Sequence, residues 1–97
     1  MIKLNRSDKK GKKYMVRIGN KTIHFGSTGY EDYTIHKDAK RKSNYISRHK
    51  ANENWNKGGM NTAGFWSRWL LWNLPSIGSS IRNIESRFNV KIQRILN

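Results

Sequence analysis

Apolar and polar residues alternate in three segments near the start of the chain, which is the pattern of strands with one buried face. The segments are residues 2–5 (IKLN), 13–18 (KYMVRI) and 21–25 (KTIHF). A polar turn around Gly11 separates the first two, and Gly19-Asn20 links the second to the third. Because both Gly and Asn tolerate positive φ, this two-residue loop is typical of a primed hairpin turn. The pattern therefore predicts a three-stranded antiparallel β-meander over residues 1–26.

The alternation also assigns each side chain to a face of the predicted sheet. If Val16 points inward, the apolar residues of the three segments share one face. That face comprises Ile2, Leu4, Tyr14, Val16, Ile18, Ile23 and Phe25. Lys13, Met15 and Arg17 then lie on the opposite face.

A basic helix is predicted after the meander. Residues 27–36 suit an ordered loop rich in glycine and tyrosine, and Thr34 or Asp38 is placed to cap a helix over residues 37–51. The apolar stripe of this helix is thin, consisting mainly of Ala39, Tyr45 and Ile46. A broad flank of the helix therefore faces water, and that flank is basic.

Two further helices are predicted in the second half of the chain. The first covers residues 62–74, where Thr62 can cap it and Pro75 ends it, since the residue before a proline is pushed out of the α region. The second is an amphipathic helix over residues 76–89. Its apolar stripe consists of Ile77, Ile81, Ile84 and Phe88. Residues 90–96 suit either a short closing strand or a helical tail.

The length and the lack of cysteine bound the architecture. A chain of 97 residues has room for one ordinary hydrophobic core. Without cysteine it forms neither disulfides nor thiolate zinc sites, which fits an intracellular protein. The sequence thus predicts a single α+β domain in which the N-terminal meander packs on two or three helices.

The charge of the chain points to a polyanionic partner. Lys and Arg number 20 against 6 Asp and Glu, which gives a formal net charge of +14. Self-repulsion at this imbalance destabilises the compact state, and a polyanion relieves it. The excess is concentrated in residues 1–50, where the chain is least apolar.

Two basic clusters form the predicted nucleic-acid site. The first is the polar turn before the second strand, and the second is the basic helix, where Lys37, Arg41 and Arg48 would share a face. The residues assigned to phosphate contacts are Lys12, Lys13, Lys37, Lys40, Arg41, Arg48, His49, Lys50 and Arg68. Such contacts position a nucleic acid without selecting its sequence, and lysine-rich helices also bind acidic lipid surfaces.

The tryptophan-rich helix has three interpretations. We expect it to be the central core element, packed between the meander and the last helix. Base stacking on exposed tryptophan is an alternative, since every base has a π-face. Docking on a protein partner through Trp66, Trp69 and Trp72 is another.

No catalytic or metal-binding signature is found, so we expect a non-enzymatic protein without a cofactor. The three histidines, His24, His36 and His49, have no i, i+4 spacing and no cysteine beside them. A nuclease cluster of Asp32, Asp38 and Glu53 near His36 and His49 is a distant alternative, because nothing fixes its geometry.

The N-terminus lacks the apolar segment of a signal peptide, and the tryptophan run is too short to span a bilayer. We therefore expect an intracellular protein without a transmembrane segment.

The chain contains three distinctive motifs: Phe25-Gly26 before the glycine-rich loop, His36-Lys37-Asp38 followed by Arg41, Tyr45, Arg48 and His49, and the run GFWSRWLLWN. These motifs resemble those of a family of small basic proteins of large nucleocytoplasmic DNA viruses of algae and protists. The resemblance extends over nearly the entire chain, and this family has no established activity to carry over. It implies a viral setting, with the protein in the infected cell and in the virion. The leading hypothesis is a protein that binds DNA through its backbone and compacts or retains a viral genome. The alternative is a minor capsid or assembly component that docks through the tryptophan helix.

Overall fold

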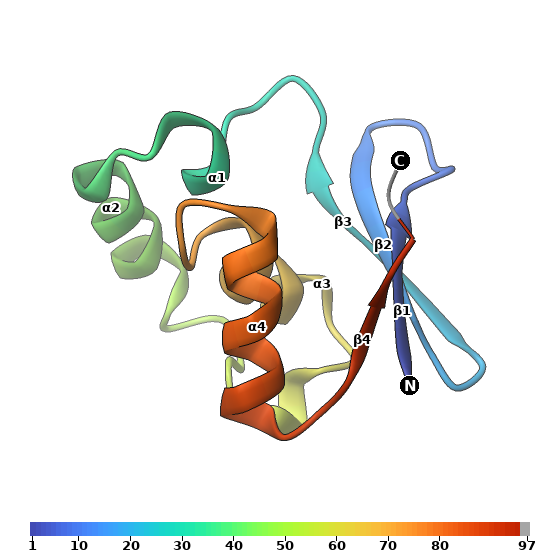
Figure 1. The fold of residues 1–97 in the computed structure, drawn as a ribbon. Helices are drawn as coiled ribbons and strands as arrows, with labels where there is room; N and C mark the ends of the chain where they lie inside the picture. The colour runs from blue at the N-terminus through green and yellow to red at the C-terminus, as the bar shows by residue number, and fades with distance from the viewer. Residues whose placement is uncertain (96–97) are drawn as a thin grey trace.

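The computed structural model describes residues 1–95, and its elements form one sheet with helices on one side (Figure 1). The strands are β1 (Ile2–Arg6), β2 (Lys12–Ile18), β3 (Lys21–Ser27) and β4 (Ile92–Arg94). The helices are α1 (Tyr33–His36), α2 (Ala39–His49), α3 (Ala63–Trp66) and α4 (Ile77–Phe88), with a 3₁₀ helix at Lys57–Gly59 and a π-helical turn at Ser67–Leu71. The order of strands in the sheet is β3-β2-β1-β4. The predicted α+β class is confirmed.

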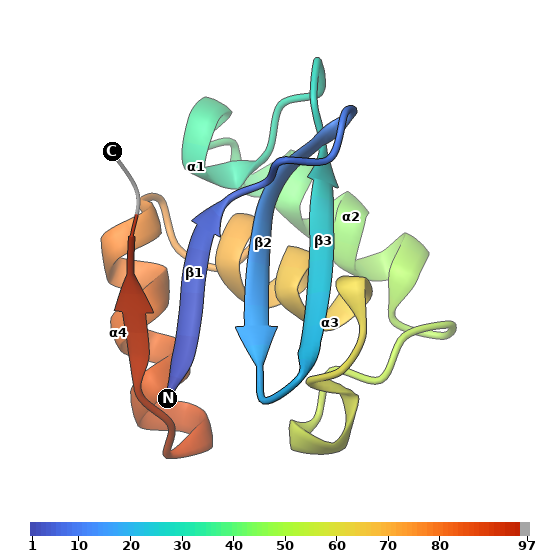
Figure 2. The same ribbon diagram turned by 90° about the vertical axis from the view of Figure 1, so that its right-hand side faces the viewer.

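The predicted meander is present, and its faces are as predicted except at Lys13, which was expected on the outer face but pairs with Asp32, the N-cap of α1, on the helical side. β1, β2 and β3 pair antiparallel, and the register aligns Leu4 with Val16 and Val16 with Ile23. The apolar side chains of the three strands therefore share the face that the helices cover (Figure 2). At the β2–β3 turn only Gly19 takes a positive φ, of 58°, while Asn20 does not. The turn thus needs its glycine at the first central position.

The residues after α4 form a strand. β4 pairs in parallel with β1, and Ile92 lies opposite Ile2. Asn89 ends α4 with a φ of 55°, and the carboxylate of Glu85 accepts a hydrogen bond from the Ile92 N–H at 2.9 Å. Of the two alternatives for residues 90–96, the closing strand is therefore correct for the described part. Leu96 lies outside the described residues.

The tryptophan-rich segment is the central element of the core, as expected. It packs between the inner face of the sheet and α4, and Phe65, Trp66 and Leu70 are fully buried. The predicted uninterrupted helix over residues 62–74 is instead α3 followed by the π-helical turn. Thr62 caps α3 by accepting a hydrogen bond from the Phe65 N–H.

The basic helix begins later than predicted. Lys37 has a φ of 55°, which ends α1 and separates it from α2. Asp38 caps α2, since its carboxylate accepts hydrogen bonds from the N–H groups of Lys40 and Arg41. The predicted helix over residues 37–51 is therefore Ala39–His49, and the predicted loop over residues 27–36 contains the single turn α1.

Candidate nucleic-acid interface

A cleft of about 770 Å³ opens between the sheet and α2 on the helical side of the molecule. One wall is the open end of the β2–β3 hairpin, where β2 begins and β3 ends, and the opposite wall is α2. The floor is α3 with the π-helical turn, and residues 30–32 close one end. The two basic clusters predicted from the sequence meet here, because Lys12 comes from the hairpin, while Arg41, Arg48 and His49 come from α2.

The cleft side of α2 is set by helical periodicity. Arg41, Tyr45 and Arg48 are spaced by four and three residues, so they follow one side of the helix. Tyr45 is buried, whereas the two arginines are exposed, and all three line the cleft. The arginines therefore belong to its solvent-accessible rim.

Aromatic stacking fixes the position of α2 against the core. The rings of Tyr45 and Trp72 are stacked, with centroids 4.4 Å apart and planes 2° apart. Two histidine rings extend this stack into an aromatic column. The ring centroid of His49 lies 4.3 Å from that of Tyr45, and the ring centroid of His36 lies 5.3 Å from that of Trp72. In addition, the Lys42 ammonium donates a hydrogen bond to the Asn73 carbonyl. These contacts hold the α2 wall of the cleft against the core.

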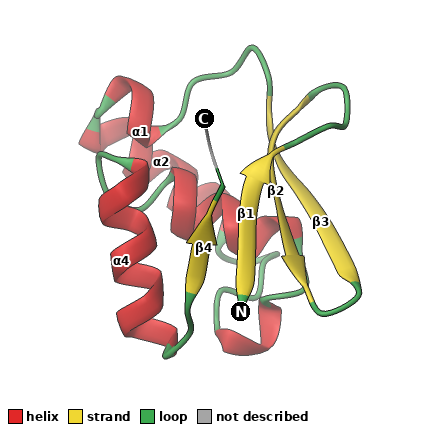
Figure 3. Cartoon of the chain, turned by 45° about the vertical axis from the view of Figure 1, so that its right-hand side comes forward, coloured by secondary structure: helices red, strands yellow, loops and turns green. Residues whose placement is uncertain are grey.

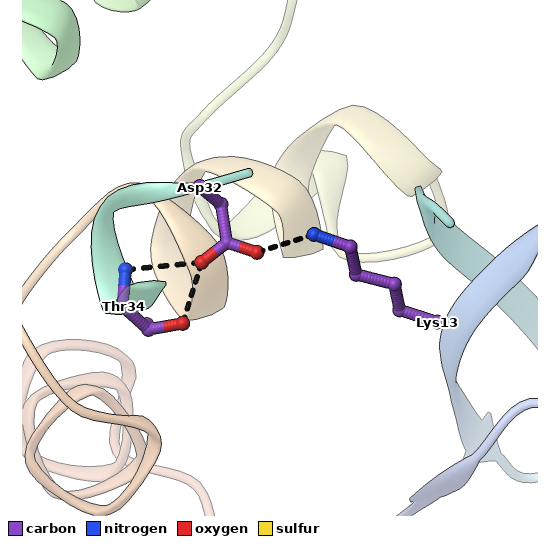
Figure 4. Close-up of polar contacts among 3 residues, drawn as sticks. All are labelled: Lys13, Asp32 and Thr34. Atoms are coloured by element: carbon purple, nitrogen blue, oxygen red, sulfur yellow. Dashed lines mark hydrogen bonds and ion pairs between the residues drawn. The ribbon is translucent and has the colours of Figure 1, made fainter. Parts of the chain in front are cut away.

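An ion pair holds the loop at the end of the cleft to the sheet (Figure 4). The Lys13 ammonium lies 2.7 Å from the Asp32 carboxylate, and the two side chains are 15% and 3% exposed. The other oxygen of Asp32 caps α1 by accepting hydrogen bonds from the Thr34 N–H and hydroxyl. Lys13 was predicted to contact phosphate, but here its charge is already neutralised by a buried carboxylate.

The remaining charged side chains of the cleft differ in whether they have a partner of opposite charge. Arg41 pairs with Glu31 at 3.1 Å, and both side chains are about half exposed, so water and salt weaken this pair. Lys12 and Arg48 make no ion pair within residues 1–95. Glu53 lies against the backbone of Gly64 on the floor of the cleft, where a side chain at Gly64 would overlap its carboxylate. The rim is thus cationic, and the acidic groups lie at one end and on the floor.

Burial changes the acidity of the residue at the centre of the α2 wall. It raises the pKa of Tyr45 to about 12, and the nearby carboxylate of Glu53 contributes in the same direction. The phenol is therefore neutral in the physiological range. Tyr45 acts as a stacking residue there and not as a charged one.

Four of the predicted phosphate ligands do not line the cleft. Lys37, Lys40 and Lys50 are exposed outside it. Arg68 is half-buried between the rings of Trp55 and Trp69, 5.4 and 4.3 Å from their centroids, and donates a hydrogen bond to the Trp72 carbonyl. Burial, and to a smaller degree Arg87, lowers the pKa of Arg68. Its contacts make it a structural cation of the core, where a phosphate has no access.

The three tryptophans assigned to partner docking face three different neighbours. Trp66 is fully buried against the sheet residue Phe25, and its indole N–H donates to the Met60 carbonyl. Trp69 is 9% exposed, packs on α4, and donates to the Trp55 carbonyl. Only Trp72 is partly exposed, and it lines the cleft. Docking through all three would require the core to open.

The residues of the nuclease alternative are occupied with structural contacts. Asp38 caps α2, Asp32 pairs with Lys13, and the His36 Nδ1 atom accepts a hydrogen bond from the Asp38 N–H. Within the described part of the chain, no group of three or more histidine or acidic side chains is arranged to hold a metal ion.

Sequence reasoning missed the acidic floor and the aromatic column of the cleft. Glu53 was considered only for a nuclease cluster, and its place on the floor of the cleft could not be predicted because it lies in a turn region whose position depends on long-range packing. Tyr45 was recognised as an apolar position of α2, but its ring partner Trp72 lies in a distant segment. No helix within residues 1–95 is long and apolar enough to cross a membrane, which agrees with the expectation of no transmembrane segment.

Comparison with known proteins adds one similarity. Residues 2–49 match the model of a family of unknown function (DUF5754). The matched segment runs from β1 to the end of α2, so it includes Lys12 and the whole α2 wall of the cleft but none of the tryptophan-rich segment. No curated protein and no solved structure matches the chain.

Proposed function

We propose that the protein binds nucleic acid, most simply DNA, through phosphate contacts at the rim of this cleft. The main support for this proposal is that the β2–β3 hairpin and the separate helix α2 bring Lys12, Arg41 and Arg48 to the opening of one cleft. Each phosphate that such side chains neutralise releases counterions, which drives association. The proposed role is binding and not catalysis.

The chemistry of the rim supports contact with the backbone and not with bases. Lys12 and Arg48 are flexible cations without an acidic partner in residues 1–95. Trp72 and Tyr45 stack on each other, so their ring faces are already largely occupied. Tyr30 at the end of the cleft is exposed and is the one lining ring within residues 1–95 that is free to stack on a base. Because base stacking uses several such rings, we expect duplex DNA to bind at least as well as single strands.

We extend this proposal to the viral setting that the sequence motifs imply. A net charge of +14 on 97 residues suits a protein that neutralises a long polyanion. Compaction or retention of a viral genome, in the infected cell and in the particle, is the role that this charge supports. The alternative of an assembly protein docking through the tryptophan helix has Trp72 alone to offer at the surface.

The test compares two arginine variants that have the same net charge. Arg48→Gln removes a cation from the rim of the cleft, whereas Arg82→Gln removes one from the exposed side of α4, outside the cleft. Binding to a short DNA duplex is measured by gel retardation and tryptophan fluorescence over a range of salt concentrations. The slope of log affinity against log salt should fall by about 0.9 for Arg48→Gln and stay unchanged for Arg82→Gln.

Two results would contradict the proposal. If wild-type protein retards neither duplex nor single-stranded DNA at low salt, nucleic-acid binding is excluded. If both variants lose affinity equally, binding follows overall charge and the cleft has no special part in it.

A further inference from the structure

The outer face of the sheet is not covered by any described element (Figure 3). The described helices all lie on the inner face (Figure 2). The outward side chains of the four strands are exposed or half-buried. The cleft lies on the helical side, and the outer face is therefore on the opposite side of the sheet from the proposed interface. The amino-acid sequence shows what chemistry this second surface presents.

One row of side chains crosses the outer face through all four strands in register. Arg17 of β2 lies opposite Lys3 of β1, Thr22 of β3 lies opposite Arg17, and Gln93 of β4 lies opposite Lys3. All four residues are exposed. Each is a hydrogen-bond donor, and at the usual strand spacing the row is about 14 Å long. A shallow hollow of about 370 Å³ lies beside it, lined in part by Lys3 and Arg17.

The pairing of Lys3 with Arg17 is unfavourable in the protein alone. Like charges directly opposite each other on neighbouring strands destabilise a sheet. No acidic residue relieves the repulsion, because none lies on the outer face of β1–β4. Asp8 is in the β1–β2 turn, and the other five acidic residues lie in the helical part of the chain. The row is therefore complementary to an anion that the protein itself does not supply.

The other side chains of the outer face favour a phosphate backbone over bases or an apolar partner. The neighbouring row consists of His24, Met15 and Asn5, which are half-buried. His24 is the only aromatic ring among the outward positions, and its Nδ1 atom lies 2.8 Å from the Ser7 hydroxyl. Sheets that bind single-stranded RNA present several aromatic rings for stacking, and this face does not.

We propose that the outer face of the sheet is a second DNA-binding surface that takes the phosphate backbone of a duplex. Together with the cleft on the opposite side, it allows one chain to contact two duplexes at once and to bridge them. This inference rests on the proposed function of the cleft, and it adds a mechanism by which a monomer compacts DNA.

The experiment compares bridging with binding in two double variants of equal charge. Lys3→Gln with Arg17→Gln removes the cationic pair of the row, and Lys57→Gln with Arg82→Gln removes two exposed cations from outside both surfaces. Bridging is measured as energy transfer between two duplexes that carry a donor and an acceptor dye. Binding of a single duplex is measured by gel retardation, and circular dichroism melting checks the fold of each variant.

We expect the Lys3/Arg17 variant to retain single-duplex binding close to that of the Lys57/Arg82 control, while its bridging becomes weaker than that of the control. Loss of two phosphate contacts should lower the salt slope of bridging by about 1.8. Because the like-charge pair is gone, the Lys3/Arg17 variant should melt at the same or a higher temperature than wild type.

Each other outcome overturns the inference in a recognisable way. If wild type binds one duplex but the Lys3/Arg17 variant bridges as well as the control, the sheet face is not a site, while the cleft proposal stands. If single-duplex binding falls as far as bridging, the sheet is the primary surface and the cleft is not. If wild type binds no DNA, both proposals fail, and capture of acidic vesicles by wild type would then assign the row to lipid headgroups.

Discussion

Replacing Asp32 by Asn tests how the loop at the end of the cleft is held. Asn keeps the shape of the side chain and an oxygen that can accept the Thr34 N–H, so the cap of α1 is retained. The change removes only the negative charge that faces the Lys13 ammonium at 2.7 Å. The variant therefore isolates the ion pair from the cap.

The expected cost follows from the burial of the two partners. Removing one partner of a fully buried pair costs about 3–5 kcal/mol. Lys13 remains 15% exposed, and its flexible stem lets the ammonium move toward water, so the loss should approach that of one charge-assisted hydrogen bond, about 2 kcal/mol. For a domain of this size, that corresponds to a fall in Tm of about 8–16 °C.

Asp38→Asn is the matched control. Asp38 also caps a helix, accepting hydrogen bonds from Lys40 and Arg41, but it has no ion pair within residues 1–95. Its loss is limited to the charge at the helix N-terminus, about 0.3–1 kcal/mol. Urea denaturation followed by tryptophan fluorescence gives both free energies of unfolding. In the Lys13→Met background, Asp32→Asn should cost less than in wild type, because no cation is left unpaired.

Equal losses for Asp32→Asn and Asp38→Asn would refute this reasoning. The ion pair would then add nothing beyond a cap, and the end of the cleft would be held by packing alone. A loss that is the same with and without Lys13 would lead to the same conclusion.

Two further predictions concern the walls of the cleft. Because the folded-state pKa of Tyr45 is raised to about 12 from its ordinary value of 10.0, the native state keeps its proton longer than the unfolded state. The free energy of unfolding that is linked to this proton is fully present below pH 10 and is lost as the pH rises toward 12; it amounts to about 2.7 kcal/mol. Tyr45→Phe should remove this part of the alkaline loss of stability in denaturation curves measured from pH 9 to 12. Gly26 has a φ of 77°, and an added Cβ would lie 2.8 Å from the buried Leu71 side chain. Gly26→Ala should therefore cost about 1–3 kcal/mol more than Gly11→Ala, since Gly11 has a similar φ of 88° but open space around it; equal losses in thermal melts would show that no steric clash is made.

The elements that sequence patterns predicted best are those whose signals are local. Alternation fixed which side of the meander is apolar, because each strand side chain follows its neighbour by a simple period of two. Thr62 caps α3 as predicted, and Ser76, the first residue of the predicted last helix, caps α4. The break at Lys37 was harder to predict. Asp32 caps the short helix α1 and Asp38 caps α2, so the chain leaves one helix at Lys37 and enters another directly after it.

The elements that could not be predicted depend on contacts between distant segments. β4 has only three residues, and its pairing with β1 is set by where α4 delivers the chain. The tryptophans recur every three residues, which drifts around a helix of 3.6 residues per turn. Trp66, Trp69 and Trp72 consequently face the sheet, α4 and α2 in succession. The sheet and the last helix were expected as neighbours of this segment, but the stacking of Trp72 on Tyr45 of α2 was not.

The fold resolves the conflict between a large positive charge and a small core by separating them. The aromatic residues of the second half fill the space between the sheet and the helices, and Arg68 is the one cation that the core stacks between tryptophan rings within residues 1–95. Other basic side chains lie at the surface, among them those of the cleft rim on one side of the sheet and those of the Lys3–Arg17 row on the other. On neither surface do acidic side chains fully neutralise the basic ones. A polyanion that occupies both would lower the repulsion in the folded state and stabilise it by mass action, so binding and folding stability should rise together for this protein.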